Sequence, residues 1–84
     1  MTRLIRCIAW FDKKTEYMVS REELKDLSVE EIRELLQLPY DPEDPELYYG
    51  YNVTEEAANK LKLHMEHKFN FKKYDYQFSC YQGP

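Results

Sequence analysis

Two histidines with the spacing of possible metal ligands, His64 and His67, stand in the stretch HMEH. Residues three apart share one face of a helix, so two imidazoles there could bind one metal ion. A third ligand is not evident nearby in the sequence, and the metalloprotease pattern HExxH is absent. We therefore interpret both histidines as polar helix residues and predict neither a metal site nor a cofactor.

The stretch YDPEDPELYYGY, residues 40–51, concentrates four acids, two prolines and four tyrosines in twelve positions. Several carboxylates close together suit calcium, but calcium loops need a flexible, glycine-centred turn. Pro42 and Pro45 should instead hold this segment extended. We therefore interpret the acids as a solvated loop and predict no calcium site. The tyrosines either form a contact surface or pack into the core.

No arrangement typical of catalysis is recognisable in the sequence. Serine and cysteine do not accompany histidine in a nucleophile pattern, and two glycines are too few for a phosphate-binding loop. The carboxylates are too numerous to nominate an acid and base pair. Cys7 and Cys80 lack metal-type spacing and fall in strand-like patterns, which predicts free thiols. We expect a protein that is not an enzyme.

Charge is distributed unevenly along the chain. Residues 22–56 carry twelve acids and two bases, a net charge of −10, whereas the segments on either side are each +3 and the whole chain is −4. An acidic field repels nucleic acid and attracts basic proteins. Because tyrosine is enriched at protein interfaces, the acidic, tyrosine-rich middle is predicted to bind a basic partner. The predicted partner-binding residues are Glu30, Glu34, Tyr40, Asp41, Glu43, Asp44, Glu46, Tyr48, Tyr49 and Tyr51.

The elements that must position this surface follow from local patterns. At 84 residues the chain is expected to be one domain, residues 1–84. Residues 3–11 are apolar on nearly both faces, which predicts a central strand, and DKKT at 12–15 predicts the turn of a hairpin. Alternation in the segment from 72 predicts a last strand beside the first. Residues 47–53 could add a short edge strand.

Two helices are predicted between the strands. Ser28 and Glu31 form a capping box, and Pro39 should stop that helix. Thr54 should cap a second helix, whose inner apolar stripe continues to Met65. Leu63 falls on the far side of that helix, so either the helix ends earlier or Leu63 makes a second, minor contact. The predicted fold is a two-layer α+β domain: an antiparallel sheet of three strands, or four with the edge strand, packed with two helices in the order β-β-α-loop-α-β.

Three segments resemble a known family: DKKTEYMV after the first strand, YYGYNVTEEAANKL running into a helix, and the closing KYDYQFSCYQ. Together they are similar to a small, uncharacterised bacterial family of α+β domains associated with immunity genes of polymorphic toxin systems, including contact-dependent growth inhibition. The resemblance implies a non-enzymatic protein that binds the C-terminal toxin domain of a secreted effector, often a nuclease. It carries over no individual residue.

The resemblance, together with the acidic, tyrosine-rich middle of the chain, implies an immunity protein that neutralises a basic toxin domain. No apolar run is long enough to span a membrane and no signal peptide is recognised, so we expect a cytoplasmic protein that binds neither membrane nor nucleic acid directly. The oligomeric state stays open. The alternatives are a regulatory adaptor for another basic protein, or a small ligand-binding domain or enzyme that uses the tyrosine cluster with His64 or His67.

Overall fold

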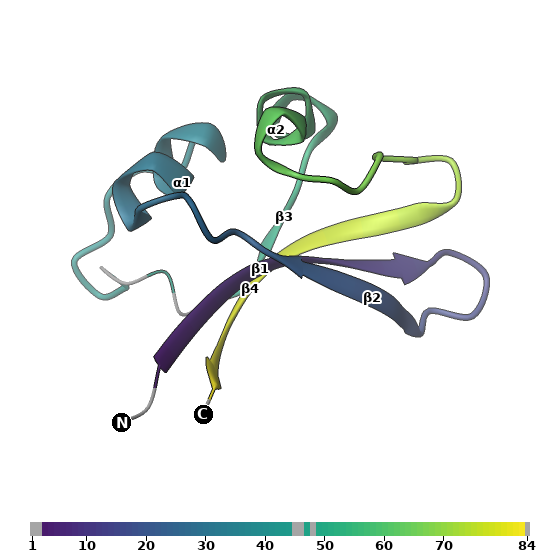
Figure 1. Cartoon of the computed structure of the whole chain (residues 1–84), viewed down its shortest axis with the longest axis horizontal. Coiled ribbons are helices and arrows are strands. Elements are labelled where there is room, and N and C mark those ends of the chain that lie inside the picture. Colours follow the sequence, from purple (N-terminus) through teal and green to yellow (C-terminus); the bar gives the residue numbers. More distant parts are fainter. Residues whose placement is uncertain (1–2, 45–46, 48, 84) are drawn as a thin grey trace.

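The α+β class predicted from the sequence is confirmed by the computed structural model, which describes residues 3–44, 47 and 49–83. Four antiparallel strands form one sheet in the order β2-β1-β4-β3. The helices α1 and α2 lie on the same side of that sheet (Figure 1). The strand between the two helices is the fourth strand that the sequence left open.

The strand β1, Arg3–Asp12, lies between β2, Met18–Glu23, and β4, Tyr74–Gly83, as its apolar character predicts. The turn that joins β1 to β2 is closed by the Asp12 carboxylate, which accepts the amide N–H groups of Lys14 and Thr15. Aspartate commonly forms such turns with its own downstream backbone. The predicted hairpin is therefore present.

Helix α1, Val29–Leu35, begins with the predicted capping box: Ser28 Oγ accepts the Glu31 amide and Glu31 Oε1 accepts the Ser28 amide. It ends before Pro39, because Gln37 adopts a left-handed φ of 57° and the Leu38 amide donates to the Arg33 carbonyl. This is the Schellman arrangement that satisfies the last carbonyls of a helix.

Helix α2, Glu55–Leu61, begins at Thr54, whose Oγ1 accepts the Ala57 amide as predicted. It ends earlier than the stripe reaching Met65 suggested: a 3-10 turn, η1, Lys62–His64, follows it, and Met65 is extended. Leu63 consequently lies on the surface, 81% exposed. The helix therefore has the earlier end, which is one of the two outcomes that the position of Leu63 allowed.

The core lies between the sheet and the helices. Ile8 of β1 is paired with Phe78 of β4, and both are completely buried against Ile32 of α1 and Leu61 of α2. The short strand β3, Tyr51–Asn52, pairs with Phe78 and Gln77 of β4 at the sheet edge. This edge strand places the end of the acidic loop next to the core.

The opposite face of the sheet has an apolar centre as well. Ile5, Cys7 and Ala9 are buried on β1. The Arg21 guanidinium of β2 lies 4.0 Å from the ring centre of Tyr81 on β4, so the two side chains meet across β1. Stacked arginine and tyrosine can shield apolar surface while the charge stays hydrated. Burial raises the pKa of the Cys7 thiol.

Candidate functional site

The predicted acidic residues are placed by α1 and by the loop that follows it. Glu30 and Glu34 are exposed on α1, and Asp41 and Glu43 are exposed in the loop. We call these four carboxylates the acidic surface. Figure 1 shows α1 and the loop on the same side of the molecule, away from the β1–β2 turn.

Two tyrosines of the loop are presented to solvent. Tyr40 is 64% exposed and Tyr49 is 58% exposed. The Arg33 guanidinium lies 5.1 Å from the ring centre of Tyr40, a cation–π contact that orders this ring on the surface. Tyr40 and Tyr49 therefore remain candidates for contact with a partner.

Asp44 requires a correction, because its side chain is only 2% exposed and is turned inward. One carboxylate oxygen, Oδ2, accepts the Tyr51 hydroxyl at 2.7 Å and the Tyr49 amide at 3.2 Å. A buried carboxylate needs such donors to offset its lost hydration. Asp44 thus fixes the conformation of the loop and is not displayed for a partner.

Tyr51 is likewise engaged inside the protein. Its side chain is half-buried, its ring centre lies 6.3 Å from that of Phe78, and its hydroxyl is the donor to Asp44. This hydrogen bond to a carboxylate raises the pKa of Tyr51 to about 12. The prediction that Tyr51 contacts a partner stays a prediction, although its hydroxyl is already engaged by Asp44. Glu46 and Tyr48, also predicted to bind a partner, lie outside the described residues.

The loop is folded on itself and does not run extended as its prolines suggested. The Asp41 side chain accepts the Glu43 amide, and the Asp41 carbonyl accepts the Asp44 amide at 3.0 Å. Leu47 is buried and has a left-handed φ of 56°. Asparagine and aspartate turns of this kind compete well with extended backbone. Local hydrogen bonds and the buried side chains of Asp44 and Leu47 hold the acidic loop.

A second concentration of chemistry lies around His67, which the sequence placed on a helix with His64. His67 instead follows η1 and its imidazole stacks on the Trp10 indole, with ring centres 3.7 Å apart and planes 14° from parallel. His67 Nε2 lies 2.7 Å from the Tyr76 hydroxyl oxygen, which also accepts the Asn70 amide. The two histidines are therefore not a helical metal pair.

The hydrogen bonds define the state of this histidine. The Tyr76 oxygen accepts from Asn70 and can donate its own proton to His67 Nε2; in that arrangement the neutral imidazole carries its proton on Nδ1. Burial lowers the pKa of His67, while Glu22 opposes that shift. The imidazole is thus disposed to remain neutral and to donate from Nδ1.

Glu22 of β2 positions the segment that carries His67. Its two carboxylate oxygens accept the amides of Glu66 and His67, each at 2.9 Å. The sequence analysis counted Glu22 only as part of the acidic segment 22–56. The partners lie 44 and 45 residues away, and no local pattern joins them.

A groove runs beside this segment, between α2 and residues 65–71, with a volume of about 640 Å³. We call it the α2 groove. Its apolar lining combines Ala58 and Met65 with the parallel rings of Phe69 and Phe71. The sequence analysis missed this site, although the closely spaced aromatic residues from 69 to 76 were a visible signal. The polar lining residues are Glu55, Asn59, Lys62, Glu66, His67 and Lys68.

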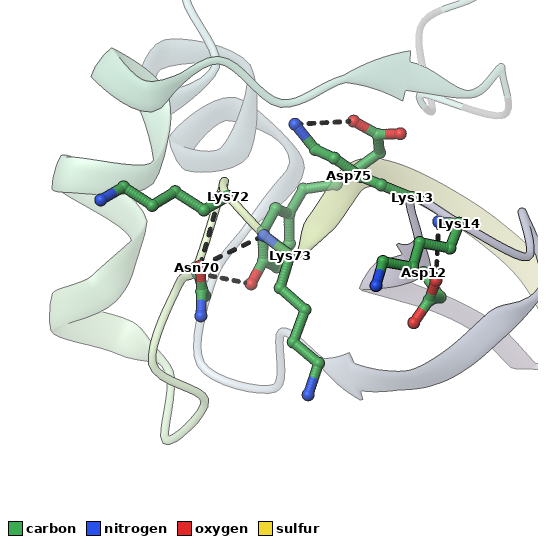
Figure 2. Close-up of polar contacts among 8 residues, drawn as sticks. Asp12, Lys13, Lys14, Asn70, Lys72, Lys73 and Asp75 are labelled. Carbon is green, nitrogen blue, oxygen red and sulfur yellow. Dashed lines mark hydrogen bonds and ion pairs between the residues drawn. The ribbon is translucent and has the colours of Figure 1, made fainter.

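The end of the molecule opposite the acidic surface carries lysines from two turns (Figure 2). The Lys13 amide donates to the Lys73 carbonyl at 3.2 Å, which joins the β1–β2 turn to the turn before β4. Asn70 Oδ1 accepts the Lys72 and Lys73 amides and shapes the second turn. We call Lys13, Lys14, Lys72 and Lys73 the lysine end. Of these side chains, Lys13 forms an ion pair with Asp75 at 3.7 Å.

Residues 5–79 match a family described as a domain of unknown function (DUF7683). No curated protein matches the chain significantly. Within the described part of the chain, no three histidine, cysteine or acidic side chains are grouped so as to hold a metal ion. No helix among those residues is both long and apolar enough to cross a membrane.

Proposed function

We propose that this chain, which belongs to the DUF7683 family, is a cytoplasmic immunity protein that binds and neutralises a basic bacterial toxin domain. The partner would be the C-terminal domain of a secreted effector, with a nuclease as the best match in charge. Binding is stoichiometric and involves no catalysis by this chain.

The observation that carries the proposal is the exposure of acids and tyrosines together on one loop. Asp41, Glu43, Tyr40 and Tyr49 are exposed, while the buried Asp44 holds the loop beneath them. A loop ordered before contact loses less conformational entropy on binding. Exposed tyrosines supply the rigid aromatic anchors common in interfaces, and the carboxylates complement lysine or arginine.

Nucleases suit this surface because they need basic clefts for the phosphates of their substrate. An acidic protein can occupy such a cleft and exclude the nucleic acid. Attraction between opposite charges also accelerates encounter, which benefits an inhibitor that must act before the toxin does damage.

The test combines the protein with the toxin domain encoded beside it. We expect a one-to-one complex by size-exclusion chromatography, survival of cells that express both proteins, and loss of toxin activity in vitro. The double substitution Asp41→Lys with Glu43→Lys should weaken binding at least tenfold, since it removes two attractive charges and adds two repulsive ones. Glu16→Lys, in the β1–β2 turn far from the acidic surface, is the matched control and should bind normally.

Three outcomes would contradict the proposal: no complex, a complex unaffected by the double substitution, or a toxin that stays active in the complex. The third result would instead favour the regulatory adaptor. Asp44→Asn provides a further check. It keeps the side-chain volume but weakens the hold on Tyr51, so it should reduce affinity less than the double charge reversal does.

A further inference from the structure

We propose that the α2 groove binds a small aromatic zwitterion, a molecule that combines a flat apolar ring with one carboxylate and one ammonium group. The lining residues of the groove include none of the acidic surface. The inference therefore goes beyond the proposed toxin binding and does not depend on it.

The apolar lining of the groove offers a place for a ring. The Phe69 and Phe71 rings lie 9° from parallel with centres 5.9 Å apart, and Met65 is half-buried beside the same space. Leu63 at the rim is 81% exposed, the largest value among the exposed apolar side chains of the described residues. An aromatic ligand would cover these side chains and remove their apolar area from water.

His67 adds a neutral hydrogen-bond donor to the same space. Its Nε2 is occupied by the Tyr76 hydroxyl, and His67 is one of the residues that line the groove. The remaining Nδ1 proton can be donated to a carboxylate oxygen. The stack on Trp10 and the Glu22 hydrogen bond to the His67 backbone fix the ring, so the donor is ordered before a ligand arrives.

The charges around the groove indicate a ligand that carries both signs. Two lysines, Lys62 and Lys68, and two glutamates, Glu55 and Glu66, belong to the lining. Because the two positive and two negative charges balance, the groove has no net preference for an anion or a cation. A zwitterion can place its carboxylate near the lysines and its ammonium near the glutamates, so charge complementarity favours it over a ligand of one sign.

L-tryptophan is a suitable probe for the intact protein, and binding can be followed by 15N chemical shifts during titration. We expect saturable shifts at the amides of residues 65–71. Indole-3-propionate lacks the ammonium group and tryptamine lacks the carboxylate. Each should bind about fivefold more weakly than tryptophan, the effect of losing one exposed charge pair.

Substitutions of exposed residues test whether the ligand binds in the α2 groove, and they should not disturb the fold. Leu63→Ser and Lys62→Glu should each weaken tryptophan binding severalfold. The control variants Val19→Ser and Lys25→Glu each remove one exposed side chain outside the α2 groove, apolar in the first case and basic in the second. Both should leave tryptophan binding unchanged. Circular dichroism confirms that each variant is folded.

Non-saturating shifts, or shifts confined to residues that do not line the α2 groove, would overturn the proposal. So would equal affinity for tryptophan, tryptamine and indole-3-propionate, because the ring alone would then account for binding. Normal binding by Lys62→Glu would overturn the assigned role of the charged rim.

Discussion

At the scale of single residues, the acidic loop contains carboxylates with opposite roles. Asp41 and Glu43 are exposed, whereas Asp44, adjacent to Glu43 in the sequence, is buried and accepts hydrogen bonds from the Tyr51 hydroxyl and the Tyr49 amide. The composition of the loop could be read from the sequence, but the inward turn of Asp44 could not. It depends on Tyr51 being fixed by the edge strand β3, which pairs with β4 more than twenty residues further along the chain.

His67 should make the free energy of unfolding depend on pH. Its pKa is lowered in the folded protein because burial disfavours the imidazolium. The unfolded chain therefore takes up a proton near pH 6.5 while the folded chain does not. The free energy of unfolding should fall as the pH drops through about 6.5, and this decrease should level off below the pKa of the folded state.

Urea unfolding at several pH values between about 5 and 8 measures this effect. His67→Phe retains an aromatic ring on Trp10 and should lose this part of the pH dependence. The matched control is His64→Phe, since His64 is the other histidine of the chain and its side chain is exposed on η1. Equal pH profiles for the wild type and His67→Phe would disprove the assignment.

At the scale of elements, the starts of the helices were predictable and the end of α2 was not. Ser28 and Thr54 accept amides three residues ahead, so their caps are local and visible in the sequence. The course of the chain after α2 depends instead on Glu22 of β2, which accepts the Glu66 and His67 amides. A tertiary contact of this range cannot be found from periodicity, which is why the sequence left the end of this helix open.

The Glu22 contact yields a prediction about local stability. Glu22→Ala should lower the free energy of unfolding by about 2 kcal/mol, because two amides lose a charged acceptor. Hydrogen exchange should accelerate most at the Glu66 and His67 amides. Glu34→Ala, on the exposed face of α1, should change neither quantity appreciably. If exchange at both amides is unchanged in Glu22→Ala, the contact does not hold this segment.

At the scale of the whole molecule, charge is separated along the fold. The acidic surface lies at the α1 side, and the lysine end lies at the β1–β2 turn and the turn before β4 (Figure 1). The sequence revealed the acidic middle and basic flanks as segments. It did not reveal that lysines from both flanks meet, since that requires the Lys13 amide to reach the Lys73 carbonyl.

This separation predicts how the proposed toxin complex forms. A basic partner is attracted by the acidic surface and repelled by the lysine end, so charge should orient the encounter as well as accelerate it. The association rate constant should fall about tenfold between about 0.05 and about 0.5 M salt, with a smaller change in dissociation. Stopped-flow fluorescence measures both rates.

The double substitution Lys14→Glu with Lys72→Glu makes the protein more acidic, but it removes the repulsion that orients the partner away from the lysine end. Its gain in association rate should therefore be small despite the larger net negative charge. A rate constant independent of salt would argue against an electrostatically steered complex.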